Sequence, residues 1–237
     1  LSFDLELTTD DAYLADYGYS GKDRLDSQVR LTRVKRDSFF DASLVHYESL
    51  RDGEDNATQP TIIGDVSYER RHFPKAVGGE LRMALDAHSH YRYSDDDLVG
   101  RDVTRTQAKL DWRKRWTLAG GLRAGVTGRL TADFFHTAQD STRADHTSQI
   151  TPAASVELRW PMQRRGAGGA TDLVEPVVQA GWVGGEPLNV ANDESTRVEF
   201  DEGNLLTLSR FPAPDRRERG ARAALGLRWM RHDPAGW

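Results

Sequence analysis

The chain has 237 residues, of which 29% are charged, and its 32 basic and 37 acidic residues leave a net charge of -5. Because the mean hydropathy is -0.66, no window approaches the ~18 apolar residues of a membrane-spanning helix, and the intermixed charges form no basic face for nucleic acid. Cysteine is absent, which excludes disulfides and thiolate metal sites within these residues.

Alternation of apolar with polar residues predicts β-strands along the whole chain, because successive side chains of a strand point to opposite faces. The pattern is brief at residues 3–7 and 29–31, and two β-rich runs, 37–47 and 61–70, alternate imperfectly. It is strongest at residues 122–134, where Leu and Ala share one parity and Arg and Thr the other. The other alternating runs are residues 80–92, 108–113, 154–160, 176–182 and 221–229.

Polar connectors rich in Asp, Gly, Asn and Ser separate these runs, as turn-forming residues do. Long connectors are predicted at residues 51–59, 94–102, 138–146 and 163–172, and tight turns at 35–38 and around 116–117. Alternation of long loops with short turns is typical of outer-membrane meanders, and aromatic residues near the strand ends suit a bilayer boundary. We therefore expect an all-β fold, an antiparallel up-and-down transmembrane β-barrel segment of roughly ten strands from a larger barrel.

Charged residues on the polar parity predict a hydrated interior, since they would be costly in a dry core. We expect seven such residues to face the lumen: Arg82, Asp86, His88, Arg113, Arg123, Arg129 and Arg159.

Other chemistry receives weaker support from the residues. Asp86, His88 and His90 share one strand face and could bind a metal, but their neighbours supply no ligand pattern. Acidic runs such as 94–97 lack the ligand order of an EF-hand, and no Ser has a nucleophile-elbow context. We expect no cofactor, no metal and no catalytic site.

An acidic, turn-rich segment leads directly into the strand pattern at residues 221–229 and carries the most specific motif. It follows Glu175-Pro176 and contains, in order, Asn192, Asp193, Glu194, Ser195, Glu199, Phe200, Asp201, Asn204, Arg210, Phe211, Asp215, Arg216 and Gly220. This order resembles the barrel domain of LptD, the outer-membrane lipopolysaccharide-assembly family. Leu206 and Ala213 depart from the family pattern, which puts the local loop geometry in doubt.

The resemblance implies that residues 1–237 are a single partial domain, part of an outer-membrane barrel that delivers lipopolysaccharide to the outer leaflet of the Gram-negative outer membrane. It implies location in the cell outer membrane, contact with lipopolysaccharide and outer-membrane lipids, a plug lipoprotein similar to LptE, and periplasmic bridge proteins of the transport system. No enzymatic activity and no nucleic acid are implied. Two alternatives stay open: another outer-membrane barrel, such as a porin or TonB-dependent-type receptor, and a soluble carbohydrate-binding β-sandwich.

Overall fold

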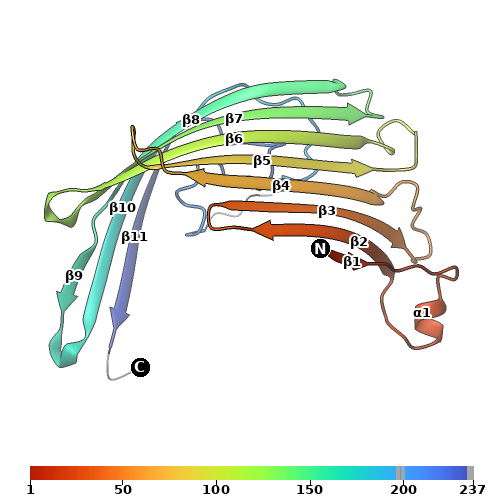
Figure 1. Ribbon diagram of the computed structural model, residues 1–237, viewed down its shortest axis with the longest axis horizontal. Coiled ribbons are helices and arrows are strands. Elements are labelled where there is room, and N and C mark those ends of the chain that lie inside the picture. The colour runs from red at the N-terminus through yellow and green to blue at the C-terminus, as the bar shows by residue number, and fades with distance from the viewer. Residues whose placement is uncertain (196–197, 199–200, 234–237) are drawn as a thin grey trace.

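A single curved antiparallel sheet makes up most of the computed structural model, which describes residues 1–195, 198 and 201–233 (Figure 1). Each strand pairs with the next along the chain, except that β8 and β9 both pair with β10. The strands are β1 (Ser2–Asp4), β2 (Arg24–Val34), β3 (Ser38–Ser49), β4 (Ile62–His72), β5 (Glu80–Tyr91), β6 (Asp102–Thr117), β7 (Arg123–Ala138), β8 (His146–Arg159), β9 (Met162–Arg165), β10 (Thr171–Val183) and β11 (Gly220–His232). The predicted all-β, antiparallel up-and-down fold is confirmed.

Helical structure is minor. It consists of α1 (Tyr13–Asp16) and the two short 3-10 turns η1 (Ala119–Gly121) and η2 (Ala167–Gly169). In the described part of the chain no helix has the length and apolar composition needed to cross a membrane.

The same Ala-Gly-Gly turn closes two hairpins at one end of the sheet. At η1 the Leu118 amide donates to the Leu122 carbonyl over 2.7 Å, and at η2 the Gly166 amide donates to the Ala170 carbonyl over 2.8 Å. The second and third residues of both turns have positive φ, between 70° and 83°, a conformation that glycine adopts without a steric penalty. The predicted connector 163–172 is therefore wrong. It contains β9, this tight turn and the start of β10, because the glycines form a hairpin turn and not an open loop.

Two tryptophans reinforce the short turns at this end of the sheet. The Trp112 indole donates to the Gly78 carbonyl over 3.0 Å, and the Trp160 indole donates to the Gly120 carbonyl over 3.1 Å. Trp112 thus ties β6 to the turn before β5, and Trp160, between β8 and β9, ties that junction to the turn after β6. An amphipathic ring of this kind suits a bilayer boundary.

Register separates the side chains onto two chemically different faces. On the convex face Leu110 of β6 lies opposite Leu130 of β7, and Val126 of β7 lies opposite Val156 of β8. Apolar residues of this face stay highly exposed, up to 77% for Leu225, and they extend across the sheet. An exposed apolar surface of this extent is typical of a site that contacts a membrane or another protein.

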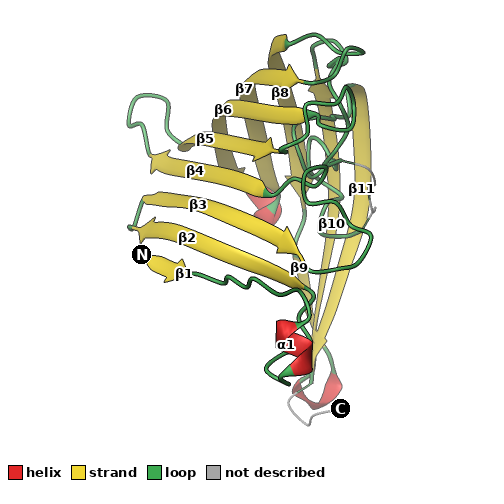
Figure 2. Ribbon diagram, turned by 90° about the vertical axis from the view of Figure 1, so that its right-hand side faces the viewer, coloured by secondary structure: helices red, strands yellow, loops and turns green. Residues whose placement is uncertain are grey.

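The sheet has little buried core of its own. Among the described residues the buried apolar cluster consists of Ala153, Val183 and Leu208, and Leu208 comes from the segment between β10 and β11. This segment, residues 184–219, is called the inner loop below. Figures 1 and 2 show its described residues, 184–195, 198 and 201–219, folded into the concave side of the sheet. The described residues form one sheet, whereas a β-sandwich has two packed sheets.

Candidate functional site: the concave face and the inner loop

Ion pairs fix the first part of the inner loop to β6 and to the loop before it. Arg101 binds the Asp193 carboxylate over 2.5 Å, and Arg105 binds the Glu194 carboxylate through two hydrogen bonds of 2.5 and 2.8 Å. Bidentate guanidinium-carboxylate contacts of this kind define orientation as well as distance. Asp193 and Glu194 of the motif thus pair with arginines that lie 92 and 89 positions earlier in the sequence.

A buried carboxylate joins the two halves of the inner loop. Asp215 accepts hydrogen bonds from the amides of Glu194 and Ser195 over 2.9 and 3.2 Å. The Ser195 hydroxyl in turn donates to the Ala213 carbonyl over 3.2 Å and accepts from the Ala213 amide over 3.1 Å. Ser195 is completely buried. These motif residues therefore build the loop itself, because they satisfy its backbone groups where water does not reach.

One buried ion pair anchors the second half of the inner loop to the sheet. Arg217 donates to both oxygens of Asp133 over 2.6 and 2.7 Å, and Gln107 donates to the same carboxylate over 2.7 Å. The Asp133 side chain has no exposed surface, and that of Arg217 is 11% exposed. These donors satisfy a carboxylate that water does not reach.

Two leucines of the inner loop pack where strands β10 and β11 carry glycine. A Cβ placed on Gly181 would lie 3.3 Å from Leu208, and a Cβ on Gly226 would lie 2.8 Å from Leu205. The glycines leave room for the leucines, and these contacts bury apolar surface that would otherwise face the concave side.

Near its end the inner loop returns to the sheet through a charged cluster. Arg210 donates to Glu218 over 2.8 Å, and Arg222 of β11 donates to Glu218 over 3.2 Å. The hydrogen bond from Arg210 is the largest cause of a lowered pKa for the Glu218 carboxyl. Arg216 lies over the Phe211 ring at 5.0 Å.

The remaining motif residues have local roles or lie outside the described residues. Asp201 and Asn204 exchange hydrogen bonds of 3.1 and 2.9 Å between their side chains and amides. Asn192 is exposed, and Gly220 begins β11 with a φ of 83°. Glu199 and Phe200 lie outside the described residues.

All seven residues expected in the lumen share the strand parity of the residues that contact the inner loop. Register places Asp86 opposite Gln107 and His88 opposite Arg105, both of which reach the loop or its anchors. Acidic neighbours accompany most of the arginines: Arg82 with Glu69 and Glu80, Arg113 with Glu80, Arg129 with Asp111, and Arg159 with Glu157 and Glu175. Arg123 lies opposite Arg159.

The Asp-x-His-x-His series has other partners. Asp86 pairs with Lys109 over 3.0 Å, and His88 contacts Asp65 over 2.8 Å. No group of three or more His, Cys, Asp or Glu residues that could hold a metal occurs within the residues that the structure describes.

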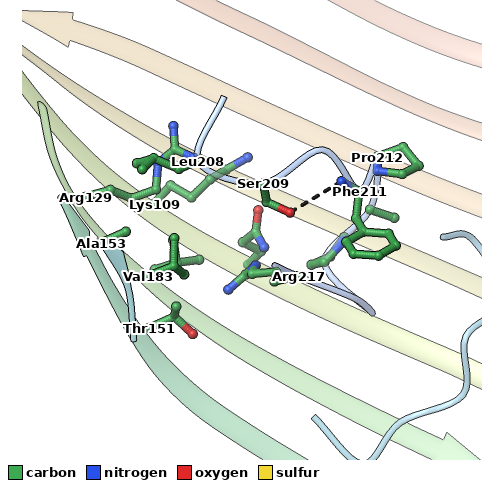
Figure 3. A pocket seen from close by; sticks show the side chains of 14 residues that line it. Lys109, Arg129, Thr151, Ala153, Val183, Leu208, Ser209, Phe211, Pro212 and Arg217 are labelled. Carbon is green, nitrogen blue, oxygen red and sulfur yellow. Dashed lines mark hydrogen bonds between the residues drawn. The ribbon is translucent and has the colours of Figure 1, made fainter. Parts of the chain in front are cut away.

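Two adjoining cavities lie between the inner loop and the sheet. The smaller, with a volume of about 140 Å³, is seen in Figure 3, where Lys109, Arg129 and Thr151 of the strands lie close to Leu208, Ser209 and Arg217 of the loop. The Phe211 amide donates to the Ser209 hydroxyl over 3.4 Å at its edge. The larger cavity, about 580 Å³, is lined mainly by charged residues of β5 to β8 and by loop residues 206–209.

Several anchors of the inner loop were not identified as site residues from the sequence. They are Arg101, Arg105, Gln107, Asp133 and Arg217. The sequence pattern places Asp133 in an alternating strand run and Arg101 in a polar connector, but it carries no information about which loop residue either one will contact.

In a comparison with protein families, residues 1–237 match the family model described as LptD, LPS transport system D. A comparison with curated proteins found no match.

Proposed function

We propose, because this chain belongs to the LptD family of lipopolysaccharide transport proteins, that its sheet forms part of the wall of an outer-membrane barrel that delivers lipopolysaccharide to the outer leaflet. The family is one of outer-membrane transport proteins and not an enzyme family. In the proposed role no covalent bond is made or broken.

The observation that carries this proposal is the difference between the two faces of one sheet. The convex face presents exposed apolar residues such as Leu130 and Val156, which suit acyl chains of lipid. The concave face presents the inner loop and the charged side chains of the strands, such as Arg82, Arg113 and Arg129. Both suit a hydrated lumen for a saccharide. A molecule with acyl chains and a long polar saccharide needs both environments.

Residues 1–237 are proposed to be one partial domain of this larger barrel. In the described residues β1 and β11 each pair with one neighbour, so both have backbone groups available for further strands. Transmembrane barrels are closed because an open edge in lipid leaves hydrogen-bonding groups unsatisfied.

The proposed partners are those of the transport system. They are lipopolysaccharide, outer-membrane lipids, a plug lipoprotein and periplasmic bridge proteins. The inner loop, as the segment that fills the concave side, is the element that a transported saccharide would have to pass or displace.

Site-specific photocrosslinking tests the assignment of the faces. A photoreactive amino acid at position 129, on the concave face, is expected to crosslink to the saccharide of lipopolysaccharide in growing cells. The same amino acid at the adjacent position 130, on the convex face, is the matched control and should crosslink to lipid acyl chains. Delivery of lipopolysaccharide to the surface without any crosslink from concave positions, across several positions of β6 to β8, would contradict the proposal.

A further inference from the structure

We propose that the two adjoining cavities described above, which share Arg129, bind a phosphorylated sugar, with its phosphate in the smaller cavity and its ring in the larger one. This inference rests on the proposed function, in which the saccharide of lipopolysaccharide occupies the concave side. It adds a defined binding site and a chemical group that the site recognises.

The wall of the smaller cavity contains cations and neutral donors but no carboxylate. Lys109, Arg129 and Arg217 line it, together with hydroxyl-bearing and apolar residues. Their acidic partners Asp86, Asp111 and Asp133 hold these side chains from positions outside this wall. Lysine and arginine have more donors than one carboxylate uses, so the remaining ones can bind a ligand oxygen.

An unpartnered hydroxyl points to a ligand in the same place. Thr151 is 2% exposed and lines the smaller cavity, and its Oγ1 atom has no hydrogen-bond partner among the described residues. Buried polar atoms are normally paired because an unpaired one costs stability. The Oγ1 atom lies 3.3 Å from the position of a Cβ on Gly185, a residue outside the cavity wall. Rotation about χ1 of Thr151 would turn the hydroxyl toward the cavity, where it could donate to a phosphate oxygen.

The larger cavity continues from the smaller one and carries an excess of positive groups. The two share Arg129, Leu208 and Ser209 as lining residues. Five arginines and three carboxylates line the larger cavity: Arg82, Arg113, Arg115, Arg129, Arg159, Glu80, Asp111 and Glu157. Within the described residues Arg115 has no ion pair with an acidic side chain.

The volumes and the mixed chemistry fit the two parts of one ligand. The smaller cavity, about 140 Å³, is well above the roughly 10–15 Å³ that one water requires, so it has room for a phosphate group. Alternating guanidinium and carboxylate groups in the larger cavity can donate to and accept from sugar hydroxyls. Charge-assisted hydrogen bonds to phosphate favour arginine-lined sites.

The test is binding of glucosamine 6-phosphate to the complete protein in detergent, measured by saturation-transfer NMR, with glucosamine and inorganic phosphate as separate probes. Wild-type protein is expected to bind glucosamine 6-phosphate more tightly than either other probe. Thr151→Val, which keeps the shape of the side chain, and Lys109→Gln should each weaken binding about tenfold, the value of one charge-assisted hydrogen bond. Thr147→Val, on the same face of β8 but outside both cavities, should leave binding unchanged.

Equal binding by wild type, Thr151→Val and Lys109→Gln would overturn the proposed site, as would equal affinity for inorganic phosphate and glucosamine 6-phosphate. Heat-modifiable migration on gels confirms that each variant is folded before it is measured. Surface delivery of lipopolysaccharide by the same variants is followed separately. A complete protein that does not deliver lipopolysaccharide would contradict the proposed function, whereas unchanged sugar-phosphate binding by the variants contradicts only the site.

Discussion

Asp133 is a carboxylate with three donors and no exposed surface, at the point where the inner loop meets the middle of the sheet. Its energetic effect follows from burial. A surface ion pair contributes little because water competes for both partners, whereas removal of one partner of a buried pair leaves an uncompensated charge. Asp133 and Arg217 belong to the second case.

Asp133→Asn should therefore destabilise attachment of the inner loop, at a cost of roughly 3–5 kcal/mol. The expected result is faster amide hydrogen exchange and faster proteolysis within residues 184–219. Asp111→Asn is the control, because Asp111 pairs with Arg129 of the neighbouring strand and not with the loop. Equal protection of the loop in wild type and Asp133→Asn would show that Arg217 does not anchor it.

Glu54, in the loop between β3 and β4, gives a pH-dependent contact. The Ser49 hydroxyl, followed by the guanidinium groups of Arg24 and Arg51, lowers the pKa of its carboxyl from 4.5 to about 2. Because the folded pKa lies below the unfolded one, the stabilisation is complete above pH 4.5 and is lost as the pH falls through about 2.

The chemical shifts of Ser49 and Arg51 should accordingly stay constant down to about pH 3 and change near the folded pKa. Glu54→Gln should abolish this titration. The Glu54 side chain is 26% exposed and lies at the surface of the loop, so the effect is limited to the local order of this loop. A titration midpoint at the ordinary value of 4.5 would show that these partners do not bind Glu54 in solution.

At the scale of elements, the strands were largely predictable and the inner loop was not. Alternation at residues 122–134 predicted β7 and its two faces, because the polarity of each side chain depends on the face of the strand where it lies. The imperfect runs 37–47 and 61–70 became β3 and β4, and the glycines of 163–172 formed a hairpin turn. The fold of the inner loop depends on distant partners: Arg101 lies 92 positions before Asp193, and Asp133 lies 84 positions before Arg217. No local sequence pattern encodes such pairing.

The contact between the inner loop and β11 depends on the absence of a side chain at position 226. Gly226→Val would place a Cβ 2.8 Å from the Leu205 side chain and 3.0 Å from that of Val177, so the Leu205 side chain must move away from β11. We expect a loss of roughly 1–3 kcal/mol in stability and increased protease cleavage near Leu205. Gly128→Val is the matched control, since nothing lies within 4 Å of a Cβ there. Identical thermal unfolding and cleavage of both variants would exclude close packing at Gly226.

At the scale of the whole molecule, the proposed function places lipid on the convex face of the sheet and water on the concave face. An arginine introduced on one face or the other should therefore change stability by different amounts. Leu130→Arg, on the convex face, is expected to reduce the free energy of folding into lipid vesicles by roughly 2–4 kcal/mol. Thr127→Arg, on the concave face of the same strand and at the wall of the larger cavity, should cost much less. Urea titration of vesicle-inserted protein measures both, and equal costs would contradict the assignment of lipid to the convex face.

The order of assembly follows from the sequence distances between contacts. Strand pairs of an up-and-down sheet join neighbours along the chain, so each hairpin can form once its two strands exist. Three ion pairs of the inner loop instead join residues 84 to 92 positions apart, on strands β6 and β7 and on the loop before β6. These ion pairs can form only once β6 and β7 lie beside the loop, whereas the contacts of Leu208 and Leu205 with Gly181 and Gly226 join nearer parts of the chain. We therefore expect attachment of the loop to the middle of the sheet to be a late step of folding.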